Sequence, residues 1–463
     1  MGRVFNTTGV CIPEKHYMVN INGRLQQIKV LVDEGKYFTI NRARQYGKTT
    51  TLRALAEMLR DEYYVVLLDF QTFDNEKFSN GNVFSVAFAG SFLRVLRRNC
   101  KTMNNEMVSV IEEMKKDADY ANRYFSLKEL FEGLSDICEA ADRKIVLMID
   151  EVDSAANNQV FIDFLAQLRA QYLDREFYPG FQSVILAGVY DIKNLKRKLR
   201  PEEGHRYNSP WNIAADFSIE MSFSESEIAG MLQEYESDHR TGMNISKMSE
   251  LLYAYTAGYP FLVSRICQLM DERVRDEYEN LKLVWTENGF NEAVRILLAE
   301  KNPLFESLVG KICDYPELSV MLKTLLFTGR NIAYNPDETS IDMAQMFGFI
   351  KNQNGNVVIA NRIFETRLYN YYLTEAKMQQ TEIYKAALQD KSQFIVNGYL
   401  DMERILERFV VHFQDIYGES DEKFLEEQGR KFFLLYLKPI INGTGNYYIE
   451  SRTRDLRRTD RKS

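Results

Sequence analysis

The segment INRARQYGKTTTLRAL, residues 40–55, contains a Gly-Lys-Thr triplet whose residue types suit the binding of phosphate groups. Gly47 allows backbone N–H groups to approach closely, Lys48 supplies a positive charge, and the hydroxyl of Thr49 is a ligand for Mg²⁺. The usual pattern of such a loop is G-x-x-x-x-G-K-S/T, and Arg42 stands where its first glycine is expected. We therefore expect Arg42 to make the first bend of the loop with a side chain attached. A chance triplet in a turn is the alternative.

Two carboxylates, Asp150 and Glu151, end an apolar run about 100 residues later, in KIVLMIDEVD. An Asp at the carboxyl end of a strand beside a phosphate loop can hold Mg²⁺, and the next Glu can polarise the water that attacks the γ-phosphorus. Carboxylates that end a strand in solvent are common, but their occurrence together with the loop predicts ATP as the ligand. The sequence thus predicts Mg²⁺ at Thr49 and Asp150, with Glu151 and Lys48 as catalytic residues.

Further polar candidates follow in AGVYDIKNLKRKLR. In ATPases of this plan a polar side chain at this place senses the γ-phosphate, but Ala187 and Gly188 offer none. The residues that follow could take this role, namely Tyr190, Asp191 and Lys193. The start of a loop explains their polarity equally well. The candidate arginine fingers are Arg197, Arg200 and Arg206. A basic face exposed to solvent is the alternative explanation for these arginines.

Five short apolar runs without polar alternation are typical of parallel strands buried on both faces. They are residues 37–40, 63–70, 144–150, 183–189 and 217–223. Helical patterns separate them, with Leu52, Leu55 and Leu59 on one stripe and Phe161, Phe164, Leu165 and Leu168 on another. Strands that alternate with helices over about 220 residues predict a doubly wound α/β domain at residues 1–223, with a five-stranded parallel sheet. The phosphate loop after its first strand makes the predicted fold that of a P-loop NTPase.

The remaining chain is predicted to be mainly helical. Ser224 and Glu227 form the signature of a capping box at the start of a helical lid, residues 224–302. In residues 303–375, helices precede two apolar runs that flank NQNGN, where Asn-Gly favours a hairpin, and this order predicts a winged helix. Residues 376–463 are predicted to hold a helical linker and two amphipathic helices.

Composition restricts the class of protein. The 463 residues, 45 % of them hydrophobic and 27 % charged, are typical of a soluble chain of several domains. There is no apolar run of the ~20 residues that a membrane helix needs and no signal-peptide core, and the five cysteines lack metal-ligand spacing. We expect a cytoplasmic protein with no membrane partner and no structural zinc. Its net charge of −8 argues against general polyanion binding, although Gly429 to Ser463 carries nine Lys and Arg against three Asp and Glu.

The segments RARQYGKTTTL, VLMIDEVD and GVYDIKNLK resemble the bacterial AAA-ATPase-like family, whose loop typically reads R-P-R-x-F/Y-G-K-S/T. Arginine is the usual residue at position 42 in that family, whereas Ala43 departs from its common proline. The similarity covers about residues 5–375 and implies ATP binding through the loop. The candidate nucleotide-binding residues of the loop are then Arg42, Gln45, Tyr46, Gly47, Lys48, Thr49 and Thr50.

Two further expectations rest on resemblance. AGYPFLV looks like the Gly-x-Pro motif of related signalling ATPases, which makes Gly258 and Pro260 candidates near the adenine, although a proline at a helix start is an equal explanation. Many family members carry a C-terminal PD-(D/E)xK nuclease domain, and the end of this chain is similar to the start of that domain, with Glu427 and Asp460 at matching places. Because no second acid and lysine follow, we expect no nuclease activity from this chain.

The sequence therefore predicts a Mg·ATP-binding protein that hydrolyses ATP. A nucleotide-gated switch with slow hydrolysis, as in signalling ATPases, is the first alternative, and an ATP-regulated DNA-binding module is the second. The expected recognition helix, DMAQMFGF at residues 342–349, has no Lys or Arg, so the winged helix better suits packing or protein contact. Nucleic acid, a protein partner and an oligomer remain open as partners.

Overall fold

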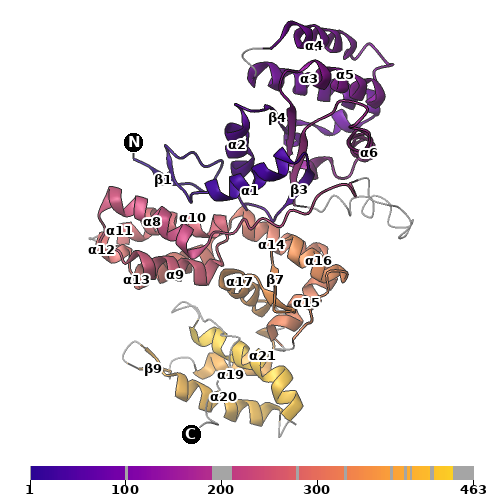
Figure 1. Cartoon of the computed structure of the whole chain (residues 1–463). Helices are drawn as coiled ribbons and strands as arrows, with labels where there is room; N and C mark the ends of the chain where they lie inside the picture. Colours follow the sequence, from indigo (N-terminus) through magenta and orange to yellow (C-terminus); the bar gives the residue numbers. More distant parts are fainter. Residues whose placement is uncertain are drawn as a thin grey trace, which may run out of the picture. The chain divides into compact units, whose positions relative to one another are not determined.

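The computed structural model describes residues 2–99, 103–189, 211–277, 281–327, 331–375, 379–390, 394–396, 399–417 and 422–441 (Figure 1). The chain forms two compact units, Met1–Ser222 and Phe223–Ser463. Each unit is described by itself below. No helix in these ranges is long and apolar enough to cross a membrane, and the four cysteines among them are free thiols.

The first unit is built on a parallel sheet, as the sequence predicts. Its strands are β3 (Tyr37–Asn41), β4 (Tyr64–Asp69), β5 (Ile145–Asp150) and β6 (Ser183–Gly188), in the order β3-β6-β5-β4. All three strand pairs are parallel, and every residue of β5 and β6 is buried. Burial along the whole length of these strands explains why their sequences lack polar alternation.

Helices cover both faces of this sheet. The helices are α1 (Asn22–Asp33), α2 (Lys48–Leu59), α3 (Gly81–Asn99), α4 (Asn105–Asp117), α5 (Leu127–Ala140) and α6 (Gln159–Leu173). Figure 1 shows α2 and α6 on opposite sides of the strands. On one face a core of phenylalanines joins α3 to α6, where the rings of Phe84 and Phe88 lie 5.3 and 4.9 Å from that of Phe164. The predicted stripes on α2 and α6 are both buried, which confirms the α/β plan.

The prediction of a fifth strand at residues 217–223 is wrong, because the main sheet has four strands among the described residues. The chain does meet the edge of β3, through one isolated parallel bridge between Phe38 and Ala215 and a hydrogen bond of 2.8 Å from the Ala215 N–H to the Tyr37 carbonyl. Beyond that point, arginine side chains hydrogen-bond to backbone carbonyls of the segment. We call residues 217–222 the connector, because they lead into the second unit.

The second unit begins with a group of helices. They are α8 (Glu225–His239), α9 (Ile245–Thr256), α10 (Pro260–Leu269), α11 (Arg275–Glu277), α12 (Leu281–Val284) and α13 (Glu287–Ala299). A π-helical turn, Met270–Val274, continues α10. The capping box at Ser224 and Glu227 is confirmed, since the Ser224 hydroxyl accepts from the Glu227 N–H and the Glu227 carboxylate accepts from the Ser224 N–H.

A helix-and-hairpin region follows, with α14 (Pro303–Asp314), α15 (Pro316–Phe327), α16 (Thr339–Met346), β7 (Ile350–Gln353), β8 (Asn356–Ile359) and α17 (Arg362–Leu373). The antiparallel hairpin is confirmed at the predicted place, with φ of 53° at Asn354 and 79° at Gly355. Both central residues have positive φ, as a tight hairpin turn requires.

The last described elements are α19 (Glu382–Asp390), β9 (Ile395–Val396), β10 (Tyr399–Leu400), α20 (Met402–Tyr417) and α21 (Glu422–Ile441). Helices α20 and α21 are the two predicted amphipathic helices, and Phe409 of α20 lies 5.7 Å from the ring of Tyr436 on α21. Glu427 belongs to α21, whereas Asp460 lies outside the described residues, so the resemblance to a nuclease start stays a prediction.

Candidate phosphate-binding site

The loop between β3 and α2 has its left-handed residues at Gln45, with φ of 56°, and at Gly47, with φ of 80°. Arg42 is not among the residues with positive φ, so the expectation that it makes a glycine-like bend is wrong. The reason is that Arg42 continues β3: its N–H donates to the Gly188 carbonyl of β6 at 3.2 Å. The bend follows three residues later, where the loop has left the sheet.

Lys48 is the first residue of α2 and is 6 % exposed. Its ammonium donates to the carbonyls of Arg42 at 2.9 Å and Ala43 at 3.0 Å, so the charge is held inside the loop. Burial lowers the pKa of Lys48, and the nearby carboxylates oppose that shift; they are Glu151, Asp153 and Asp150. A cation that is already buried can bind a phosphate without first losing a full hydration shell.

The start of α2 also suits an anion. Its N-cap, Gly47, makes no side-chain capping hydrogen bond, and its first turn has no acidic residue. The first N–H groups of a helix have no partner within the helix and carry the positive end of its dipole. A phosphate group is therefore a suitable partner for these N–H groups.

The structure brings Thr49 and Asp150 together at the end of β5. Asp150 is the last residue of that strand and is 5 % exposed. Burial raises the pKa of Asp150, while hydrogen bonds from the Thr49 hydroxyl and the Glu151 N–H lower it. A hydroxyl and a carboxylate in contact beside a phosphate loop are the oxygen ligands that Mg²⁺ prefers.

Glu151 follows directly and has φ of 53°, a left-handed conformation that is uncommon for a residue with a side chain. Burial raises the pKa of Glu151, and the Lys48 charge lowers it. Strained backbone of this kind is often found at functional sites. Glu151 and Lys48, both predicted to be catalytic, thus lie close enough for the charge of each to shift the pKa of the other.

Two other acids at this edge were not predicted. Asp153 Oδ2 accepts a hydrogen bond of 2.6 Å from the Val189 N–H just after β6, and a Cβ added at Gly188 would lie 2.8 Å from Asp153 Oδ1. Asp69 ends β4 and pairs in register with Asp150. Asp69 follows the apolar residues of the run YYVVLLDF, which is the same signal that identified Asp150 and could have pointed to Asp69.

Some predicted loop residues use their side chains elsewhere. The Arg42 guanidinium donates to the Asn41 and Ile219 carbonyls, each at 2.9 Å, and the Tyr46 hydroxyl lies 2.6 Å from that of Ser222. The Thr50 hydroxyl accepts from the Cys11 N–H at 3.3 Å. By contrast, the Gln45 Oε1 atom is buried without a hydrogen-bond partner. The ammonium of Lys48 and the Thr49–Asp150 pair therefore remain as the side chains that fit a bound Mg²⁺ and phosphate.

Two other predicted site residues, Gly258 and Pro260, belong to the second unit. For each, the local backbone structure explains the residue type without a nucleotide. A Cβ at Gly258 would lie 1.9 Å from the Phe223 carbonyl oxygen, and Pro260 is at the first turn of α10. Outside the described residues lie the candidate sensors and fingers, namely Tyr190, Asp191, Lys193, Arg197, Arg200 and Arg206.

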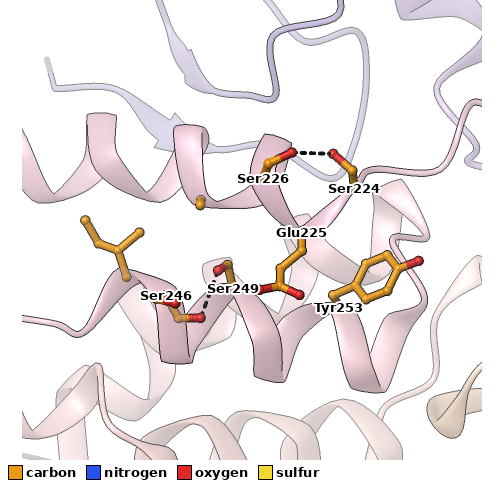
Figure 2. A pocket seen from close by; sticks show the side chains of 8 residues that line it. Ser224, Glu225, Ser226, Ser246, Ser249 and Tyr253 are labelled. Atoms are coloured by element: carbon orange, nitrogen blue, oxygen red, sulfur yellow. Dashed lines mark hydrogen bonds between the residues drawn. The ribbon is translucent and has the colours of Figure 1, made fainter.

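A separate cavity of about 630 Å³ lies in the second unit between α8 and α9 (Figure 2). Its lining is rich in hydroxyl groups and includes Ser224, Glu225, Ser226, Ser246, Ser249 and Tyr253. Three of these hydroxyls already have partners: those of Ser224 and Ser226 hydrogen-bond to each other, and that of Ser249 donates to the Ser246 carbonyl. In the described parts of the chain, no group of three or more His, Cys, Asp or Glu side chains could hold a metal ion.

Comparison with known proteins identifies the family and the fold. A family model described as an AAA-like domain matches residues 12–375. A solved structure, the Walker-type ATPase of Pyrococcus abyssi, is 12 % identical and has a TM-score of 0.53, covering 79 % of this chain and 99 % of that one. At this identity the likeness supports a shared fold. No curated protein matches the sequence significantly.

Two further solved structures are less similar. Cdc6p of Pyrobaculum aerophilum is 14 % identical with a TM-score of 0.38, covering 79 % of this chain and 97 % of that one. The ORC2 protein of Aeropyrum pernix is 10 % identical with a TM-score of 0.41, covering 80 % and 98 %. Because their TM-scores are below 0.5, these two structures add nothing to the conclusion about the fold.

Proposed function

The chain belongs to the AAA-like domain family, and from this premise we propose that it binds Mg·ATP at the loop before α2 and hydrolyses it. The observation that carries the proposal is the contact of the Thr49 hydroxyl with the buried Asp150 carboxylate. These residues come from a loop and a strand about 100 positions apart, and the fold joins them beside Lys48. The sequence predicted them from separate motifs, so their meeting supports both.

Each residue has a distinct part in this proposal. Lys48 and the first N–H groups of α2 bind the β- and γ-phosphates. Thr49 and Asp150 hold Mg²⁺, which neutralises charge on the phosphates when it is bound. Glu151 orients the attacking water and accepts a proton from it. Catalysis by this set is mainly positioning and electrostatic stabilisation.

An ATPase assay on two variants tests this function. Glu151→Gln keeps the size of the side chain but removes its charge, so we expect ATP binding to persist while turnover falls about 100-fold or more. Lys48→Ala removes the cation of the loop and is expected to weaken ATP binding by about tenfold or more. Steady-state phosphate release and binding of a fluorescent ATP analogue measure the two effects.

Glu132→Gln is the matched control, because Glu132 lies on α5 with a side chain that is 60 % exposed and pairs with Lys128 at the surface. It should leave both quantities unchanged, whereas removal of Mg²⁺ with EDTA should abolish turnover. Unchanged turnover in Glu151→Gln would contradict its catalytic role, and unchanged affinity in Lys48→Ala would contradict the position of the site.

The described geometry also favours a second function, a nucleotide-gated switch. Two side chains of the phosphate loop, those of Arg42 and Tyr46, hold the connector that leads to α8. A switch needs such a physical link between its ligand site and a second part of the chain. A turnover on the order of one per minute, far below the usual range of enzymes, would favour the switch over a motor or a metabolic enzyme.

Residues 303–375 are proposed as a winged helix that makes packing or protein contacts. The supporting observation is the order of α14, α15 and α16 before a confirmed hairpin. Helix α16 contains Asp342 and no Lys or Arg, so it is poorly suited to contact with phosphates of a nucleic acid.

A further inference from the structure

The connector is held to the first unit from two directions. From α1, the Arg24 guanidinium donates to the Glu220 carbonyl at 2.7 Å and the Ser222 carbonyl at 3.2 Å. From the phosphate loop, Arg42 donates to the Ile219 carbonyl at 2.9 Å, and the Tyr46 hydroxyl lies 2.6 Å from that of Ser222. The connector is therefore held in part by residues of the candidate ligand site itself.

Arg42 links this attachment to the position of the Lys48 ammonium. The carbonyl of Arg42 accepts a hydrogen bond from Lys48 Nζ at 2.9 Å, while its guanidinium bonds the connector. The same guanidinium lies 5.4 Å from the centre of the Phe217 ring, within the range of a cation–π contact. A phosphate that draws the Lys48 ammonium toward itself breaks the hydrogen bond from Lys48 to the Arg42 carbonyl. Arg42 is the residue whose side chain holds the connector.

The connector leads directly into the helices of the second unit. Within that unit, the Phe223 N–H donates to the Gly258 carbonyl at 2.8 Å, and Ser224 caps α8. Phe223, the residue that follows Ser222, is therefore hydrogen-bonded to the turn before α10. A change in how the connector is held has a short covalent path to α8.

We propose that Arg42 and Tyr46 are positioning residues that couple the phosphate loop to the connector, so that nucleotide binding loosens residues 217–222. This proposal rests on the proposed nucleotide binding and adds a regulatory consequence to it. Its physical basis is linkage, because a ligand shifts a conformational equilibrium only by interacting differently with the two states. Here the interaction that differs is the hydrogen bond from Lys48 to the Arg42 carbonyl, which a bound phosphate would weaken.

Hydrogen exchange of the connector, measured with and without a non-hydrolysable ATP analogue at saturating concentration, tests the coupling. In the wild type we expect the exchange of residues 217–222 to become about fivefold faster or more when nucleotide is bound. Arg42→Ala should exchange rapidly in both states and lose the response to nucleotide. Tyr46→Phe removes only one hydroxyl, so it provides a milder test in which the response should shrink if Arg42→Ala does not fold.

Arg24→Ala is the matched control, because Arg24 holds the same connector from α1 and not from the loop. We expect faster exchange in both states but an undiminished ratio between them. A wild-type connector that binds nucleotide and shows equal or slower exchange would overturn the coupling, as would a full response in both Arg42→Ala and Tyr46→Phe. Failure of the wild type to bind nucleotide in a parallel titration would instead overturn the proposed function.

Discussion

At the scale of single residues, Arg42 shows how a phosphate loop accommodates a long side chain where glycine is usual. Its backbone extends β3, its carbonyl accepts from Lys48, and its guanidinium bonds the connector. The left-handed backbone that a loop of this kind needs falls on Gln45 and Gly47 instead. A glycine at position 42 would therefore offer positive φ angles at a residue that does not adopt them, and it would remove the side-chain contact with the connector.

Gly258 provides a prediction at the same scale. It has φ of 72°, and a Cβ there would lie 1.9 Å from the Phe223 carbonyl oxygen. We expect Gly258→Ala to reduce the free energy of unfolding by about 2–4 kcal/mol, because it adds left-handed strain and forces two backbone segments apart. Urea denaturation followed by circular dichroism measures this change.

Gly230→Ala is the corresponding control in the same unit. Gly230 lies inside α8, and no atom lies within 4 Å of an added Cβ. Alanine in a helix interior is expected to stabilise by about 0.5–1 kcal/mol relative to glycine. Equal effects of the two substitutions would contradict the close approach of Phe223 to Gly258.

The site residues differ in how far the sequence could predict them. Lys48, Thr49, Asp150 and Glu151 were found because each stands in a short motif next to an apolar strand, and local patterns of this kind are visible in sequence. Asp153 was missed because its contact depends on the N–H of Val189, which follows another strand, β6. The connector contacts of Arg42 were missed for the same reason, since Ile219 is far away in the chain.

At the scale of elements, four of five predicted strands are confirmed because their apolar runs are long enough to be buried on both faces. Residues 217–223 have a similar composition but do not extend the sheet. A strand forms only where both backbone partners are available, and the connector carbonyls of Ile219, Glu220 and Ser222 accept from arginine side chains. Apolar pattern alone could not reveal that competition.

The phenylalanine core beneath the sheet gives an element-scale prediction. Phe84 of α3 is fully buried against Phe164 of α6, with ring centres 5.3 Å apart. Phe84→Ala should destabilise the protein by about 3–5 kcal/mol, because the cavity and the lost contacts separate α3 from α6. Urea denaturation of the purified protein measures the loss.

Phe177→Ala serves as its control, since the Phe177 side chain is 80 % exposed. A surface substitution of this kind is expected to change stability by no more than about 0.5 kcal/mol. A loss for Phe84→Ala as small as that of the control would show that the core does not join the two helices.

At the scale of the whole molecule, charge bears on possible partners. The chain has a net charge of −8, and α16, the recognition helix of the winged helix proposed above, has no basic residue. Affinity for double-stranded DNA depends mainly on Lys and Arg that neutralise phosphates. The described surface of α16 therefore does not provide that contact.

We accordingly predict that double-stranded DNA changes ATP turnover by less than about twofold at low salt, where electrostatic binding is strongest. The measurement is phosphate release with and without a duplex, together with binding of a fluorescent duplex. Stimulation by about tenfold that disappears at high salt would contradict the prediction and would point to basic residues elsewhere in the chain.

The connector also bears on association between molecules. Strand β3 is the last strand at one side of the described sheet, and an edge strand with unpaired backbone groups can pair with another chain and start aggregation. Residues 215–222 meet this edge through the bond from Ala215 to Tyr37 and the stacked rings of Phe38 and Phe217. Further along, their own carbonyls are bonded to arginine side chains. The segment thus covers part of the β3 edge without becoming a new edge strand, which leaves fewer β3 backbone groups open to intermolecular β-pairing.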